Sequence, residues 1–91
     1  MTRPTPKLED LVDFPTPFTF RVMGEADETL VARCTAALEG TLGRPVDEVE
    51  LRESAQGRFL AVRLGVQVHD ADEIYGVYAA LREVSGVRLV L

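Results

Sequence analysis

The chain has 91 residues, of which 46% are hydrophobic and 27% are charged, and its formal net charge at pH 7 is −5. A chain of this length forms one domain with a modest core, and its composition is that of a folded protein. The acidic balance argues against nucleic-acid binding, which needs a cationic surface, and the single cysteine, Cys34, excludes an internal disulfide.

The first seven residues are polar and contain two prolines, and the N-terminal segment lacks the apolar core of a signal peptide. No stretch approaches the ~20 apolar residues of a membrane-spanning helix. We therefore expect a cytoplasmic protein that does not bind membranes. The spacing of Leu8, Leu11 and Val12 allows a short helix within an N-terminal tail over 1–13, and the folded domain is expected over 14–91.

A first strand is predicted where Phe18, Phe20 and Val22 alternate with other residues, and Gly24 is expected to end it. Asp27 is then expected to cap the first long helix. That helix should end at a glycine, Gly43, and its apolar face is predicted to carry Leu30, Cys34, Ala37, Leu38 and Leu42.

The middle of the chain predicts a β-hairpin. One strand covers 48–54, with Val49 and Leu51 expected to face the core, and a longer strand covers 59–68. The four residues 55–58 between them include a glycine and predict a short turn.

A second helix is expected to begin with a capping box, in which Asp70 is followed three residues later by Glu73. Ser85 and Gly86 should end it, and 87–91 should form the last strand. The order strand–helix–strand–strand–helix–strand predicts an α+β, ferredoxin-like βαββαβ sandwich. Its four-stranded antiparallel sheet should have the order 4-1-3-2, with both helices on one face.

Three segments resemble the YbeD-like family of small bacterial proteins: Phe14–Gly24, the hairpin turn Ser54–Phe59, and Tyr78–Leu91. The resemblance implies a ferredoxin-like fold similar to the small-molecule-sensing ACT domains. It therefore also implies a regulatory role, and it implies no catalytic residues.

The residues themselves predict no catalytic site, metal or cofactor. His69 is the only histidine and has no second histidine or a cysteine nearby in the sequence, so a metal site is not expected. Cys34 falls on an apolar helical face, where a thiol behaves as a small hydrophobe. No nucleophile–base pair can be assembled, and an enzyme is therefore the least supported class.

One surface does predict binding. If the apolar sides of the strands face the helices, the opposite side of the sheet carries Arg21, Arg63 and Arg88 from three adjacent strands, with Phe59 beside them. The rest of that face would consist of Thr19, Met23, Glu48, Glu50, Arg52, Ala61, Gly65, Gln67 and Val90. Guanidinium groups bind carboxylates or phosphates with two hydrogen bonds, so a row of these arginines would form a partner- or anion-binding face.

Two other interpretations stay open. The arginines of this face could instead pair across strands with Glu48 and Glu50 on a solvated surface. A separate ligand loop is suggested by Gly24 and Asp27, because a glycine before an acidic helix start resembles the loop at which ACT domains bind an amino acid.

The leading functional hypothesis is a small non-enzymatic regulatory or adaptor domain that binds a partner protein through its open sheet face or sheet edge. An exposed edge strand can add a partner strand through backbone hydrogen bonds. A homodimer is compatible with the same surfaces. The alternative is an ACT-like sensor of an amino acid or another small carboxylate.

Overall fold

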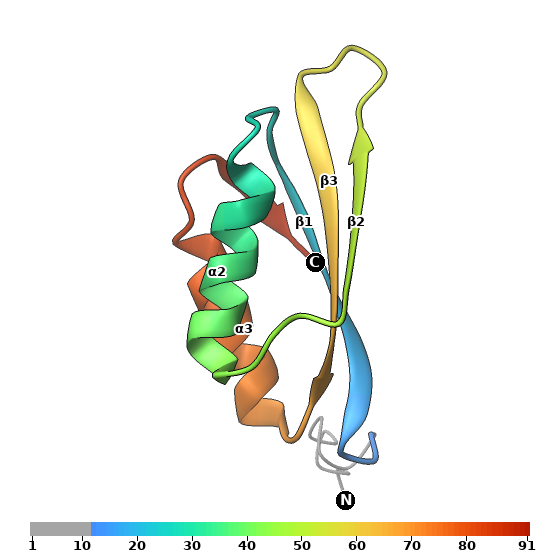
Figure 1. Ribbon diagram of the computed structural model, residues 1–91, viewed down its shortest axis with the longest axis vertical. Coiled ribbons are helices and arrows are strands. Elements are labelled where there is room, and N and C mark those ends of the chain that lie inside the picture. The colour runs from blue at the N-terminus through green and yellow to red at the C-terminus, as the bar shows by residue number, and fades with distance from the viewer. Residues whose placement is uncertain (1–11) are drawn as a thin grey trace, which may run out of the picture.

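Two helices cover one face of a four-stranded antiparallel sheet in the computed structural model, which describes residues 12–91 (Figure 1). The elements in chain order are β1 (Thr16–Glu25), α2 (Leu30–Leu42), β2 (Glu48–Glu53), β3 (Phe59–Val68), α3 (Ala71–Arg82) and β4 (Val87–Val90). The strand order is β2-β3-β1-β4. The predicted ferredoxin-like βαββαβ fold is confirmed, since this order is 4-1-3-2 read from the other edge.

The tail expected over 1–13 lies outside the described residues apart from its last two positions, and so does most of its expected short helix. Phe14 and Phe18, which follow it, are half-buried against the core. The ring of Phe18 lies 4.7 Å from that of Phe20 and 6.3 Å from that of Tyr78, measured between centroids.

The central strands β1 and β3 pair in one uninterrupted register from Thr16↔Val68 to Glu25↔Phe59. Side chains alternate between the two faces of a strand, and in β3 every second residue, from Leu60 to Val68, is buried under the helices. The buried core also includes Phe20 and Val22 of β1, Leu30, Cys34 and Leu38 of α2, and Ile74, Val77 and Leu81 of α3.

The two helices begin differently. The Asp70 carboxylate accepts the backbone N–H of Glu73 at 2.9 Å, which confirms the predicted cap of α3. Asp27, by contrast, was wrongly expected to cap α2, because the helix begins two residues later, after Thr29. Asp27 instead accepts the backbone N–H of Thr29 at 2.8 Å, within the turn that leads into the helix.

At the other end of α2, Gly43 has the left-handed backbone conformation, with φ = 71°, that the predicted helix stop requires. α2 has 13 residues and α3 has 12. Across residues 12–91, neither helix is long and apolar enough to cross a membrane.

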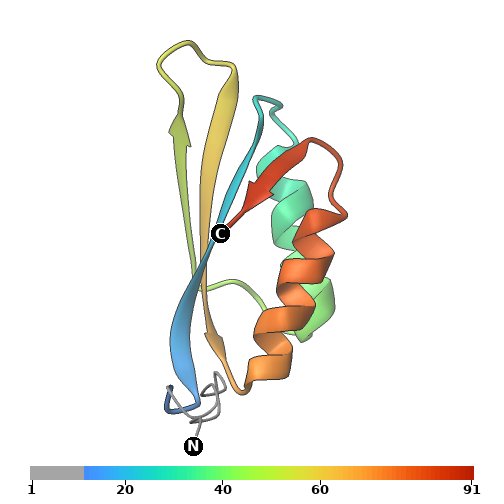
Figure 2. The same cartoon turned by 180° about the vertical axis from the view of Figure 1, so that it is seen from behind.

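The edge strand β2 lies outside the cover of the helices (Figures 1 and 2). All six of its residues are exposed. Val49 and Leu51 pair with Leu64 and Val62, so they do point to the helix side as predicted. They are nevertheless not buried: the helices pack over the other strands, which leaves Val49 44% exposed and Leu51 54% exposed.

The opposite edge is irregular. β4 is short, and its pairing with β1 shifts register between Met23 and Gly24. Nearer its start, β1 extends past β4, and there one of the outward-facing positions is Pro17, which has no N–H to offer another strand. Bulges and prolines protect a sheet edge from pairing with another chain.

Candidate functional site

The open face of the sheet brings two of the predicted arginines together. Arg21 of β1 lies directly opposite Arg63 of β3, and Arg63 lies opposite Glu50 of β2. Residues that oppose each other across a sheet share a face, with Cβ atoms about 4.5–5.5 Å apart. Glu50, Arg63 and Arg21 therefore form a row across three strands, on the side away from the helices.

This row is electrostatically unbalanced. Like charges directly opposite each other on a sheet are destabilising. Arg63 forms an ion pair with Glu50 of 3.7 Å between Nη1 and Oε2, but both side chains are more than half exposed, so the pair contributes little stability. Within residues 12–91, no carboxylate or other side chain pairs with the guanidinium of Arg21.

Arg88 lies off this row. Arg21 exchanges two backbone hydrogen bonds with Leu91, of 3.1 and 2.7 Å, so Leu91 and not Arg88 is its neighbour on the β4 side. Arg88 instead forms an ion pair with Glu25, near the other end of β1. The register shift between Met23 and Gly24 causes this displacement.

The same register shift also changes which apolar residues of β4 face the open side of the sheet. Val90, which was wrongly expected on the open face, pairs with the buried Val22 and packs against the core. Leu89 lies opposite Met23, and these two side chains are 48% and 46% exposed, while Leu91 is 63% exposed. Sequence reasoning missed Leu89 and Leu91, because alternation alone does not reveal a bulge.

Apolar side chains and the two arginines surround a shallow hollow of about 160 Å³ on this face. It is lined by Arg21, Val22, Met23, Ala61, Val62, Arg63, Leu89 and Leu91. A second hollow, of about 380 Å³, shares Ala61 and Arg63 and continues to Glu50, Leu51 and Arg52. Phe59 is 38% exposed and lies on the same face, at the start of β3 and opposite Glu25. We call the surface of Arg21, Met23, Ala61, Arg63, Leu89 and Leu91 the arginine face.

The arginine face can bind a group that carries a negative charge beside an apolar part. Guanidinium groups bind carboxylates through paired, charge-assisted hydrogen bonds. The leucines and Met23 would remove apolar surface of a ligand from water, which contributes about 25 cal/mol per Å².

The predicted ligand loop is closed by internal contacts. Gly24 is buried, and a Cβ atom at this position would lie 2.8 Å from both the Gly86 carbonyl oxygen and the Leu30 Cδ2 atom. Three hollows described within residues 12–91, of about 380, 300 and 160 Å³, are not lined by Gly24 or Asp27. Gly24 therefore has a packing role: it permits the close approach of β1 to the α3–β4 turn.

The side chain of Asp27 also accepts hydrogen bonds from within the chain. Its Oδ1 atom accepts hydrogen bonds from the backbone N–H of Thr29, at 2.8 Å, and from the Thr29 hydroxyl, at 2.9 Å. These two bonds, with a smaller contribution from Arg33, hold the pKa of the Asp27 carboxyl below its ordinary value. Arg33 also donates to the carbonyl of Ser85, so this cluster ties the start of α2 to the end of the α3–β4 turn.

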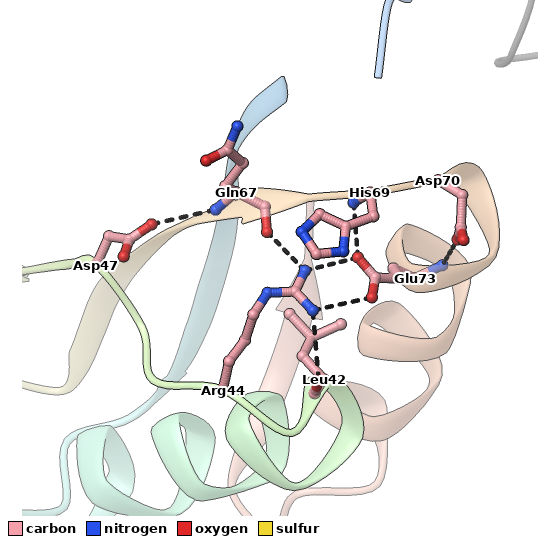
Figure 3. Close-up of polar contacts among 7 residues, drawn as sticks. All are labelled: Leu42, Arg44, Asp47, Gln67, His69, Asp70 and Glu73. Atoms are coloured by element: carbon pink, nitrogen blue, oxygen red, sulfur yellow. Dashed lines mark hydrogen bonds and ion pairs between the residues drawn. The ribbon is translucent and has the colours of Figure 1, made fainter. Parts of the chain in front are cut away.

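A polar cluster at the opposite end of the helices was not predicted (Figure 3). Arg44 and Glu73 form a two-pronged ion pair, with Nη1–Oε2 at 3.0 Å and Nη2–Oε1 at 2.6 Å. Arg44 also donates to the carbonyl oxygens of Gln67, at 2.7 Å, and Leu42, at 3.3 Å. Glu73 also accepts the backbone N–H of His69 at 2.7 Å.

These contacts lower the pKa of Glu73 from 4.5 to about 2, chiefly because Arg44 bonds to its carboxylate. They raise the pKa of Arg44 for the same reason. Each charged group already has partners, so the cluster joins the α2–β2 loop to α3 and leaves no group directed at a ligand. In the described part of the chain, no three His, Cys, Asp or Glu side chains group closely enough to hold a metal ion.

Sequence comparison identifies relatives along nearly the whole chain. Residues 9–91 match a family model described as "Protein of unknown function (DUF493)". A "UPF0250 protein" of Shewanella piezotolerans is 34% identical over 86 residues, which are 93% of this chain and 96% of the relative. Another UPF0250 protein, from Shewanella oneidensis, is 35% identical over 86 residues, which are again 93% of this chain and 96% of the relative. The predicted resemblance to the YbeD-like family is confirmed.

Solved structures share the fold. The solution structure of protein HP0495 from H. pylori has a TM-score of 0.79 at 18% identity and covers 100% of this chain and 97% of its own. The ACT domain from GTP pyrophosphokinase of Chlorobium tepidum has TM-scores of 0.59 in its crystal structure and 0.64 in its NMR structure. Identity to that domain is 20–21%, over 82% of this chain, so the likeness shows the fold alone.

Proposed function

This chain belongs to the DUF493 family, and we propose that it is a non-enzymatic regulatory or adaptor domain that binds a partner protein on the arginine face. The observation that carries the proposal is the placement of Arg21 directly opposite Arg63, beside exposed apolar residues. Two like charges on facing positions reduce the stability of the sheet. A bound carboxylate would offset that repulsion.

The partner that suits this face is a peptide segment or protein surface with acidic and apolar side chains next to each other. Met23, Leu89 and Leu91 are each close to half exposed or more and supply the apolar part. Arg21 supplies the charge, because it has no ion-pair partner within residues 12–91.

The shifted pKa values do not point to a catalytic site. Within residues 12–91, the groups whose pKa is shifted are Asp27, Cys34, Arg44 and Glu73. Cys34 is fully buried, and each of the other three contacts neighbours that hold loops and helix ends together. Catalytic groups, by contrast, have shifted pKa values in a cleft that a substrate can enter.

The proposal can be tested by photo-crosslinking in the cells that produce the protein. A photoreactive residue at Met23 should form a discrete adduct with a second protein, whereas one at Tyr75, exposed on α3, should not. Reversing both arginines, with Arg21→Glu and Arg63→Glu, should abolish the adduct.

A matched control replaces Arg58 and Arg82 with glutamate. This makes the same change in net charge at exposed positions outside the arginine face. Loss of the adduct in this control as well would show that net charge, and not the arginine face, governs capture. Equal adducts from Met23 and Tyr75 would contradict the proposed surface.

The alternative function is an ACT-like sensor of an amino acid or another small carboxylate, with Gly24 and Asp27 in its ligand loop. Its support is the shared fold of the Chlorobium tepidum ACT domain. Because Gly24 is packed against Gly86 and Leu30, a ligand there would bind outside this contact. A thermal-shift screen against amino acids and small carboxylates tests it: ligand at 100 times its dissociation constant adds about 2.7 kcal/mol of stability.

A further inference from the structure

Beyond the arginine face, we infer that β2 is a self-association edge: two copies of the chain pair their β2 strands antiparallel, with Leu51 on the two-fold axis. The resulting sheet would be continuous across both copies. This inference uses a different surface from the proposed function and does not depend on it.

The backbone of β2 is available for pairing. Ser54 N–H donates to the Phe59 carbonyl oxygen at 2.9 Å. Because hydrogen-bonded and non-bonded positions alternate along antiparallel strands, the even-numbered residues of β2 bond to β3. Val49, Leu51 and Glu53 therefore direct their N–H and C=O groups away from the sheet. Within residues 12–91, β2 pairs with β3 alone, so no strand lies on the side to which these groups point.

The edge lacks the proline and the register shift that interrupt the opposite edge of the sheet. β2 contains no proline, and its register with β3 is unbroken from Glu48↔Gly65 to Glu53↔Leu60. The opposite edge of the sheet carries a register shift and, where β1 extends past β4, Pro17. Proteins use such devices to prevent strands from pairing between chains, so their absence from β2 is consistent with an edge that pairs.

The charges on β2 select one register. With Leu51 opposite Leu51 of the second copy, Glu50 of each copy lies opposite Arg52 of the other. Opposite charges at facing positions are stabilising. A shift that placed Glu50 on the axis would set two glutamates face to face, and a shift to Arg52 would set two arginines face to face. The sequence Glu50-Leu51-Arg52 is thus self-complementary in one register, as a two-fold interface requires.

The apolar residues fit the same register. Val49 and Leu51 lie on the helix side and are 44% and 54% exposed, and β2 as a whole lies outside the cover of the helices (Figure 1). Pairing brings the two Leu51 side chains together and places each Val49 opposite Glu53 of the second copy, with Leu51 of that copy on the diagonal. The exposure of Leu51 would decrease.

The pairing has a geometric consequence for the open face. A two-fold axis perpendicular to the sheet keeps both helix layers on one side. Arg21, Arg63 and Glu50 of one copy would then continue into Arg52 of the other, so the two arginine faces would form one surface.

Charge reversal tests the pairing, with sedimentation velocity as the readout. The wild-type chain should form dimers as its concentration rises from about 10 μM to 1 mM, the range suited to a small interface. Glu50→Arg places two Arg–Arg pairs at the interface and Arg52→Glu places two Glu–Glu pairs. Each variant alone should raise the dimer dissociation constant at least about tenfold.

Two rescue experiments make the test specific. An equimolar mixture of the Glu50→Arg and Arg52→Glu chains restores both opposite-charge pairs and should form heterodimers. The chain with both changes is again self-complementary and should dimerise as the wild type does. Both side chains are exposed, so these variants should fold, which far-ultraviolet circular dichroism confirms.

Hydrogen exchange supplies a second readout on the full wild-type chain. Protection of the outward-facing Leu51 amide should increase with protein concentration, while the Arg52 amide, which points to β3, should be protected at all concentrations. A wild-type chain that stays monomeric to 1 mM would overturn the inference. So would dimers that both single reversals leave unchanged, or Leu51 exchange that is independent of concentration.

Discussion

Arg44 and Glu73 are 29 positions apart in the sequence and form a two-pronged ion pair that joins the α2–β2 loop to the first turn of α3 (Figure 3). Their side chains are 25% and 21% exposed. The pair is therefore shielded from solvent more than an ordinary surface ion pair, and it also orders the carbonyl of Gln67 and the amide of His69.

Replacing Arg44 with methionine should lower the free energy of unfolding by about 1–3 kcal/mol, because Glu73 then keeps its partly buried charge without an ion-pair partner. Arg58→Met, in the exposed hairpin turn, is the control and should change stability by less than about 0.5 kcal/mol. Urea denaturation at pH 7 measures both. Equal changes in the free energy of unfolding for the two variants would show that the Arg44–Glu73 ion pair does not stabilise the fold.

The contribution of this pair should also depend on pH. The pKa of Glu73 is lowered from 4.5 to about 2 in the folded chain. A lowered pKa means that the stabilisation is fully present above about pH 4.5 and is lost as the pH falls toward 2. The difference in stability between wild type and Arg44→Met should therefore shrink across this window. A difference that stayed constant from pH 7 to pH 2.5 would contradict the role given to Glu73.

Gly24→Ala should destabilise the domain by about 1–3 kcal/mol, because its Cβ would meet the Gly86 carbonyl oxygen and Leu30 Cδ2 at 2.8 Å. Gly40→Ala is a matched control within α2: its Cβ has no neighbour within 4 Å, and alanine is the better helix former by about 1 kcal/mol. The melting temperature should thus fall for Gly24→Ala and rise for Gly40→Ala. If Gly24→Ala were as stable as wild type, the packing role of Gly24 would be wrong.

The fold could be predicted from the sequence because its signals are local. Alternation in β3, the glycine turn at Gly57 and the Asp70–Glu73 cap each depend on residues that are near one another in the chain. Short connections then leave few ways to assemble the elements. The pairing of Arg44 with Glu73 had no such signal, since nothing in their spacing relates the two residues.

The candidate site was predictable only in part. Alternation correctly placed Arg21 and Arg63 on one face, and the strand order made them neighbours. The position of Arg88 depends on a register shift that arises where β1 meets the α3–β4 turn, which is a tertiary contact. The exposure of Val49 and Leu51 likewise depends on how far the helices extend over the sheet, which a strand's own pattern does not contain.

Cys34 should be inert toward thiol reagents in the folded protein. It is fully buried in α2, and burial raises the pKa of its thiol, so little of the reactive thiolate is present. A chromogenic disulfide reagent at pH 8 should react within minutes in denaturant and at least about 100 times more slowly without it. Rapid reaction under native conditions would mean that α2 opens readily or that Cys34 is accessible.

Removing the charge of Arg21 should make the protein more stable while it weakens partner binding. Arg21 opposes Arg63 and has no ion pair within residues 12–91. Arg21→Gln should therefore raise the free energy of unfolding by about 0.2–0.5 kcal/mol, and the gain should shrink in 1 M salt, which screens exposed charges. Arg58→Gln, without an arginine opposite, should show no such gain. A loss of stability in Arg21→Gln that persists in high salt would mean that Arg21 stabilises the sheet. The proposed binding role of Arg21 rests on its destabilising position opposite Arg63, so this result would contradict it.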